Sequence, residues 1–138
     1  MSFTALHKVP FAACDPAGLV FFPQYLVMLN TLVERWFDED LGVSYSGLIS
    51  QRHLGLPTVR LEVDFTAISR HGDALTQHLR LVQLGRSSMT VQATFSGGEE
   101  LRLRARQVLV CTDLANHRPV PLPADLRAAL EPHLEKPE

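Results

Sequence analysis

The residues best suited to chemistry lie in one short segment, where a carboxylate precedes the start of an apolar helix. Asp15 belongs to the sequence CDPAG at positions 14–18, whose Asp-Pro pair and glycine are typical of a turn. Pro23 suits the first turn of a helix, where a missing N–H costs nothing. The free N–H groups and positive dipole end there can stabilise charge developing on a carbonyl oxygen. The carboxylate could activate water or attack that carbonyl.

The same residues also have purely structural interpretations. Asp15 could serve only as a turn residue before Pro16, since Asp-Pro turns are common. Cys14 is more typical of a small packed hydrophobic residue than of a nucleophile, because the sequence places no histidine beside it. No Gly-x-Ser-x-Gly segment is present, which argues against a Ser-His-Asp hydrolase.

The long helix is predicted to run from Pro23 to about Leu41 and to end at Gly42, a natural helix C-cap. Its apolar side chains recur at helical spacing and predict a broad buried stripe. The members of the stripe are Tyr25, Leu26, Met28, Leu29, Leu32, Val33, Trp36 and Phe37. Shorter helices are predicted at about 45–52 and 123–133.

Strands are predicted at 3–11, 58–67, 74–84, 87–96 and 101–111. In 58–67, apolar residues at odd positions alternate with polar ones, as in a half-buried strand. Short links between strands favour antiparallel pairing. A five-stranded antiparallel sheet with one long helix on one face is a two-layer α+β domain. The outer face is expected to be solvated or to meet a partner subunit; it carries Arg60, Glu62, Arg102, Arg104 and Arg106.

Bulk properties favour a single soluble domain over 1–138, with a disordered tail at about 134–138. With 13 basic and 15 acidic residues, the net charge is −2, which gives no reason to expect binding to nucleic acid or an anionic membrane. No signal peptide or membrane-spanning run is visible. Cys14 and Cys111 are read as free thiols, so a cytoplasmic location is expected. The six histidines are scattered, and no metal site is predicted.

The stretch from His7 to Tyr25 resembles the signature of the 4-hydroxybenzoyl-CoA thioesterase family, in which a DPAG turn is followed by aromatics, proline and tyrosine. That family has the hot-dog fold, a sheet wrapped around a long central helix, with the element order predicted above. The resemblance implies hydrolysis of an acyl-CoA thioester to free acid and coenzyme A. Coenzyme A is part of the substrate, so no cofactor is expected. Asp15 would be the catalytic carboxylate, as nucleophile or general base, and the Phe22 N–H would polarise the carbonyl.

Several other residues are predicted to contact the substrate. Tyr25 closes the motif at the helix start. Asn30 is the polar residue within the central apolar stretch: its amide is either exposed or bonded to the backbone, or it forms a hydrogen bond to a polar substituent of the acyl group. Family members often carry several basic residues after the third strand, which meet coenzyme A phosphates. This chain has Arg86, Ser87 and Ser88 there, which form either a simple hairpin turn or a phosphate site.

The resemblance also implies a homo-oligomer, because family members form dimers and tetramers with sites between subunits; a homotetramer is the larger form expected. A non-catalytic acyl-CoA or acyl-carrier-protein binding protein on the same fold is the alternative. Asp15 separates the two, since a binding protein has no need of a carboxylate beside a thioester. A hot-dog dehydratase is less favoured, because it usually needs a histidine near the helix start, where positions 21–25 read FFPQY.

Overall fold

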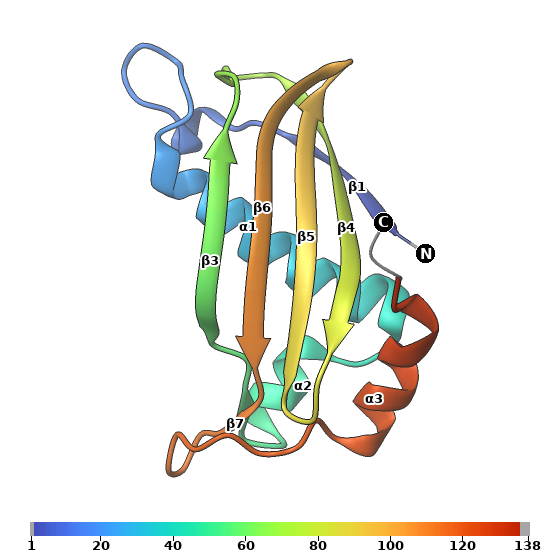
Figure 1. Ribbon diagram of the computed structural model, residues 1–138. Coiled ribbons are helices and arrows are strands. Elements are labelled where there is room, and N and C mark those ends of the chain that lie inside the picture. Colours follow the sequence, from blue (N-terminus) through green and yellow to red (C-terminus); the bar gives the residue numbers. More distant parts are fainter. Residues whose placement is uncertain (1, 136–138) are drawn as a thin grey trace.

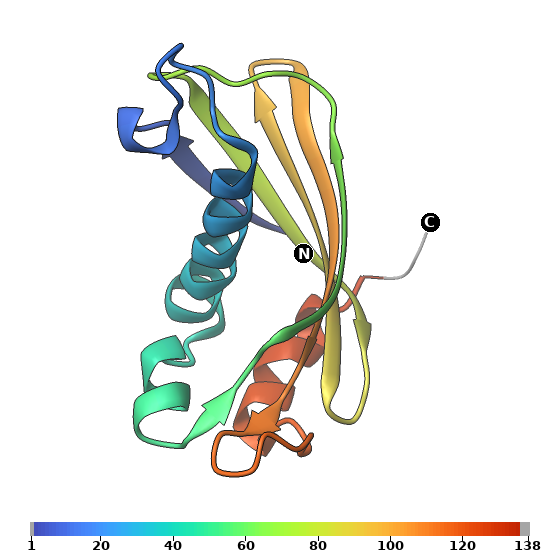
Figure 2. The same cartoon turned by 90° about the vertical axis from the view of Figure 1, so that its left-hand side faces the viewer.

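The computed structural model describes residues 2–135 and has two layers, a curved antiparallel sheet and a long helix lying along one of its faces (Figures 1 and 2). The strand order is β1-β4-β5-β6-β3, and every neighbouring pair is antiparallel. The strands are β1 (Phe3–Lys8), β3 (Thr58–Phe65), β4 (Ala74–Leu84), β5 (Ser88–Gly97) and β6 (Glu100–Val110). The predicted α+β hot-dog architecture is confirmed.

The helical segments are close to those predicted. They are η1 (Phe11–Ala13), α1 (Phe22–Trp36), η2 (Phe37–Leu41), α2 (Tyr45–Ser50), α3 (Ala124–Leu130) and η3 (Glu131–His133). The long helix starts one residue earlier than predicted, and its last turn, η2, is π-helical. Gly42 ends it in the left-handed conformation, with φ 70°, as the C-cap prediction requires. A two-stranded ribbon of β2 (Leu54–Gly55) and β7 (Thr112–Asp113) was not predicted.

The core lies between α1 and the sheet. The apolar stripe of α1 is buried except for Leu26, which is half-buried. On the sheet, alternate residues of β4, β5 and β6 face the helix, including the fully buried Leu79, Phe95 and Leu103. The intervening residues of β6, such as Arg104, face outward, as predicted. One helix therefore covers one face of the sheet and holds the site-bearing segments against it.

We expect Leu32→Ala to destabilise the fold strongly, because Leu32 is fully buried at the centre of α1. Truncation of a buried leucine removes apolar burial and leaves a cavity, which costs about 2–5 kcal/mol in the free energy of unfolding. Val27→Ala on the same helix is the control, since Val27 is 54% exposed. Urea denaturation measures both, and a Leu32→Ala loss no larger than that of the control would contradict this assignment of the core.

The prediction that β3 is half-buried is wrong for the single chain. Val59, Leu61 and Phe65, which the alternation predicts on one inward face, are 60%, 37% and 49% exposed, and a register shift between Thr58 and Arg60 interrupts the alternation at Val59. The reason lies in the strand order: β3 is an edge strand, and α1 does not cover it. Its alternation still marks an apolar face, but nothing within residues 2–135 buries that face.

Two boundaries also differ from the prediction. The first strand ends at Lys8 rather than at position 11, because Pro10 has no N–H to pair and the chain turns into η1. Leu134 forms a bridge with Leu81, and the N–H of Glu135 donates to the Leu81 carbonyl, so the predicted disordered tail does not include these two residues. Positions 136–138 of that tail lie outside the described residues.

The remaining global features can be read from residues 2–135. No helix in this range is both long enough and apolar enough to cross a bilayer. Cys14 and Cys111 are free thiols. No group of three or more His, Cys, Asp or Glu side chains in this range is arranged to hold a metal ion.

Candidate active site

The Asp15 loop, residues 14–20, is a small hairpin between β1 and α1. The N–H of Asp15 donates to the Leu19 carbonyl at 2.8 Å, and Cys14 bridges Val20. Asp15 Oδ1 accepts from the N–H of Ala17 at 2.9 Å and from that of Leu19 at 3.3 Å. The turn role considered for Asp15 is therefore real, but it uses only one carboxylate oxygen. Oδ2 has no hydrogen-bond partner within the described part of the chain, and the side chain is half-buried.

The loop leads directly into the start of α1. Phe21 is the N-cap, and no side chain caps the helix there. The N–H of Phe21 donates to the Ala13 carbonyl, and that of Gln24 donates back to the Phe21 carbonyl. The N–H of Phe22 belongs to the first turn and has no partner inside the helix. An open amino end of α1 thus follows within seven positions of Asp15.

The helix-start pocket, of about 390 Å³, opens beside this end of α1. Its lining is mainly apolar and comprises Val20, Phe22, Tyr25, Phe65, Thr66, Ala67 and Ile68. Tyr25 is buried, with its ring centroid 5.6 Å from that of Phe65. Asp15 is not one of the lining residues in the single chain, but the hairpin joins its backbone to Val20 of the lining through Cys14. The structure therefore brings Asp15, Phe22 and Tyr25 into one region.

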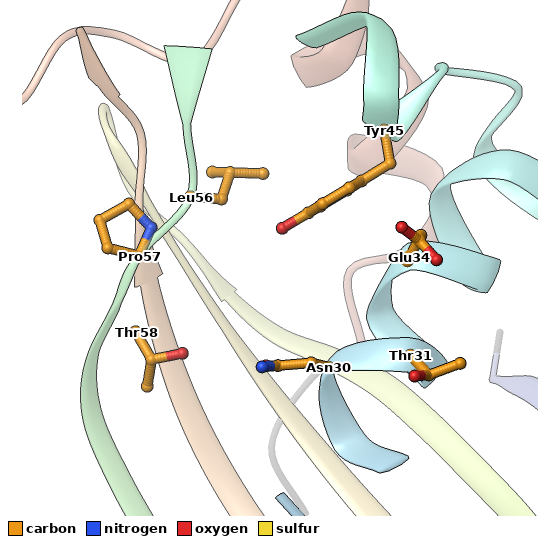
Figure 3. A pocket seen from close by; sticks show the side chains of 7 residues that line it. All are labelled: Asn30, Thr31, Glu34, Tyr45, Leu56, Pro57 and Thr58. Carbon is orange, nitrogen blue, oxygen red and sulfur yellow. The ribbon is translucent and has the colours of Figure 1, made fainter. Parts of the chain in front are cut away.

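A second pocket, the polar pocket, lies between α1, α2 and the start of β3 and measures about 340 Å³ (Figure 3). Its lining residues are Asn30, Thr31, Glu34, Tyr45, Leu56, Pro57 and Thr58. Figure 3 shows the Asn30 amide and the Tyr45 hydroxyl pointing into it from the helical side, opposite Thr58. Asn30 is exposed to this pocket rather than bonded to the backbone, which leaves its amide available.

Two hydroxyl groups of the polar pocket, those of Tyr45 and Thr58, are placed to donate hydrogen bonds, whereas that of Thr31 donates to the Val27 carbonyl. Burial raises the pKa of Tyr45, and the negative charge of Glu34 raises it further, so the phenol keeps its proton at neutral pH. Thr58 Oγ1 accepts from Gln107 Nε2 at 2.7 Å, which leaves the Thr58 proton free for another acceptor. Tyr45, Thr58 and Glu34 were not predicted, because they come from three separate segments.

The predicted phosphate residues lie elsewhere. Arg86, Ser87 and Ser88 form the turn between β4 and β5, which Figures 1 and 2 place at the opposite end of the sheet from the Asp15 loop. The 11 residues of β4 separate the two, a span of roughly 36 Å. The segment forms a hairpin turn, since the Gly85 N–H donates to the Ser88 carbonyl, and the phosphate site stays a prediction. Arg127 Nη2 from α3 donates to the carbonyls of Gly85 and Arg86 and adds a basic residue that the sequence did not reveal.

Most of the chain matches one known protein family. The profile described as "Thioesterase-like superfamily" matches residues 9–130. The chain belongs to the thioesterase-like superfamily. The match extends over the Asp15 loop, α1 and all the long strands except β1, so it includes both pockets.

Two curated members of the superfamily align over nearly their whole length. A 1,4-dihydroxy-2-naphthoyl-CoA hydrolase from Synechocystis is 30% identical, with 94% of each chain covered. A 4-hydroxybenzoyl-CoA thioesterase from Pseudomonas is 28% identical, with 90% of this chain and 94% of the relative covered. The predicted family and the predicted enzyme class, an acyl-CoA thioester hydrolase, are thereby confirmed.

Solved structures agree with the fold. The crystal structure of a 1,4-dihydroxy-2-naphthoyl-CoA thioesterase from Synechocystis superimposes with a TM-score of 0.85 at 30% identity, covering 94% of this chain and 96% of that one. The structure of a gentisyl-coenzyme A thioesterase, BH1999, gives a TM-score of 0.83 at 23% identity, with 92% and 98% covered. The sheet and central helix of this chain therefore have the arrangement found in thioesterases of known structure.

Proposed function

We propose that this thioesterase hydrolyses a hydroxylated aromatic acyl-CoA, with Asp15 as the catalytic carboxylate. The observation that carries the proposal is the difference between the hydrogen-bond partners of the two Asp15 carboxylate oxygens. Oδ1 is held by two loop N–H groups, whereas Oδ2 has no partner among the described residues, in a loop that leads into the open start of α1. The turn uses only Oδ1, so the second oxygen remains available for chemistry.

The chemistry follows from these two elements. A thioester carbonyl placed at the start of α1 would accept from the Phe22 N–H, and the helix dipole would stabilise its developing negative charge. Asp15 Oδ2 either attacks the carbonyl carbon, giving a mixed anhydride as the coenzyme A thiolate leaves, or takes a proton from the water that attacks it. Hydrolysis then releases the free acid. Coenzyme A is part of the substrate, and this route uses no further cofactor.

The acyl group is inferred from the two pockets and the relatives. The Synechocystis and Pseudomonas relatives are named for aromatic acyl groups that carry hydroxyls. The helix-start pocket is apolar and suits an aromatic ring, whereas the polar pocket offers the Asn30 amide and the Tyr45 hydroxyl to a polar substituent. A hydrogen-bonding group that the bound substrate covers discriminates against an acyl group that lacks its partner.

A homodimer through β3 would join the two pockets. The free edge of β3 is long and apolar on its inner face, and such edges pair with another strand unless they are protected. A two-fold pair must keep side chains of the same face opposite one another. Centring the pair on Leu61 sets Arg60 opposite Glu62 of the partner subunit, whereas centring it on Glu62 opposes two like charges.

In the pair centred on Leu61, Phe65 lies opposite Pro57 of the partner subunit. Phe65 lines the helix-start pocket and Pro57 lines the polar pocket, so the helix-start pocket of one protomer adjoins the partner's polar pocket. Each active site would then combine Asp15 and Phe22 from one protomer with the polar pocket of the other. A homotetramer would pair two such dimers.

The same two-fold operation also indicates which residues would contact the coenzyme A phosphates. It moves the turn between β4 and β5 of one protomer to the Asp15 end of the other. The turn then lies about three strand spacings from β3, or roughly 15 Å. Arg86, Ser87 and Ser88 of one protomer would thus contact the phosphates of the substrate bound to the other, and Arg127 would hold the turn in place.

The free thiols Cys14 and Cys111 support a reducing, cytoplasmic location.

We expect Asn30→Ala to reduce selectivity for a hydroxylated ring. Loss of one hydrogen bond between neutral groups is worth about 1 kcal/mol, so kcat/KM for 4-hydroxybenzoyl-CoA should fall about 5- to 10-fold. The value for benzoyl-CoA, which has no hydroxyl, should change less than twofold. Asn116→Ala is the matched control, because the Asn116 side chain accepts from a loop N–H, that of Arg118, and does not line the polar pocket. Equal losses on the two substrates would rule out a role for Asn30 in recognising the hydroxyl.

A further inference from the structure

The geometry assigns a positioning role to Arg102, which lines neither pocket and has no contact with Asp15. Its guanidinium fixes the strap, residues 66–73, and the strap in turn fixes the Asp15 loop. This inference rests on the proposed function and extends it to a residue about ninety positions away in the sequence.

The first link runs from Arg102 to the strap. Arg102 lies near the start of β6, and its side chain is only 13% exposed. Its Nη1 donates to the Ile68 carbonyl at 3.0 Å and to Ser69 Oγ at 3.2 Å. The same nitrogen lies 2.8 Å from Asp73 Oδ2, and the Arg102 carbonyl accepts from the N–H of Thr66 at 3.0 Å. One side chain therefore holds the strap at its middle and its end.

The second link runs from the strap to the Asp15 loop. The N–H of Val20 donates to the Ser69 carbonyl at 2.9 Å, and the N–H of His71 donates to the Gly18 carbonyl at 2.8 Å. These bonds flank Leu19, whose backbone N–H and carbonyl both bond to Asp15. Displacement of the strap would therefore move the loop residues that hold the catalytic carboxylate.

The Arg102 contacts are partly shielded from solvent. Ser69 is fully buried, and the Asp73 carboxylate faces the guanidinium. Arg102, together with the N–H of Arg70, holds the pKa of Asp73 below its usual range, so this pair stays charged at neutral pH. Removal of the guanidinium would leave the Asp73 charge with only the Arg70 N–H and the buried Ser69 hydroxyl without this partner. The strap would then have to shift to resolve them.

The test compares Arg102→Met with Arg104→Met. Arg104 lies two residues further along the same outer face of β6, is exposed, and forms no ion pair with any other described residue. We expect Arg102→Met to lower kcat 10- to 100-fold, the effect of a displacement near 1 Å at the reacting group, and Arg104→Met to change it less than twofold. Arg102→Lys keeps a charge facing Asp73 and should recover part of the loss. In an Asp15→Asn background, Arg102→Met should cost less than twofold, because both changes act on the same carboxylate.

Hydrogen exchange tests whether Arg102 fixes the Asp15 loop through the strap, and it does so without an activity measurement. In Arg102→Met, amides of 15–20 should exchange at least 10-fold faster, while those of β5 stay unchanged. If the wild-type chain turns over no thioester, the proposed function fails, but the exchange rates still decide the mechanical link. The inference is overturned by unchanged exchange at 15–20. It is equally overturned by a folded Arg102→Met enzyme with kcat within twofold of wild type, or by the same loss in the Asp15→Asn background.

Discussion

Asp15→Asn should lower kcat/KM for the best acyl-CoA substrate by at least 1,000-fold while leaving the fold intact. Asparagine keeps an Oδ1 that can accept from the N–H groups of Ala17 and Leu19, so the Asp15 loop retains its hydrogen bonds. It replaces only Oδ2, the oxygen proposed to attack the carbonyl or to take a proton from water. The loss is then a direct measure of that oxygen, since removing a nucleophile or base typically costs several powers of ten.

The chain offers a closely matched control for this substitution. Asp113 Oδ1 also accepts from the N–H two residues later, that of Ala115, at 2.8 Å. Asp113→Asn therefore makes the same chemical change in the same kind of turn, but at β7, near the other end of the sheet (Figure 1). Steady-state hydrolysis of 4-hydroxybenzoyl-CoA should separate the two variants clearly. Wild-type kcat/KM in a folded Asp15→Asn protein would refute the catalytic assignment.

Local patterns in the sequence were sufficient for the long strands, for the long helix and for the Asp15 loop. The alternation along 74–84 and 101–111 gave β4 and β6 with the correct faces, because strand side chains alternate strictly between the two sides of a sheet. The helical spacing of apolar residues gave α1 with its buried stripe. The turn residues around Asp15 gave the hairpin, because Asp-Pro and glycine act through bonds within a few positions.

The rest of the site depends on contacts between distant segments. Tyr45 and Thr58 join Asn30 in the polar pocket only because α2 and the start of β3 pack beside α1. Arg102 meets the strap through the pairing of β6 with β3, which no local pattern encodes. The sequence likewise places Arg86 in a turn, but only the 11-residue length of β4 shows that this turn is remote from Asp15 within one chain.

The apolar alternation of β3 shows another limit of sequence patterns. A pattern of apolar residues predicts that a face is buried but does not say which chain buries it. In the single chain that face is exposed, because α1 ends its coverage short of the edge strand. If a second copy covers it, as proposed, then the edge of β3 is at once the dimer interface and the boundary between the two pockets.

Leu61→Glu should therefore convert the dimer into folded monomers and lower kcat/KM at least 100-fold. In the proposed pair Leu61 lies on the two-fold axis, so the substitution sets two carboxylates directly opposite each other in an apolar contact. The monomer tolerates the change, since Leu61 is already 37% exposed there. Activity falls because the polar pocket of the partner no longer completes the site.

Leu6→Glu provides the control on the other edge of the sheet. Leu6 belongs to β1 and is 72% exposed, so the same chemical change there should leave both the mass in solution and the activity unaltered. Light scattering after gel filtration gives the mass, and turnover at rising protein concentration shows whether activity follows dimer formation. A dimeric, fully active Leu61→Glu protein would exclude pairing through β3. Dissociation by Leu6→Glu would instead assign the interface to β1, and the composite active site would then have to be abandoned.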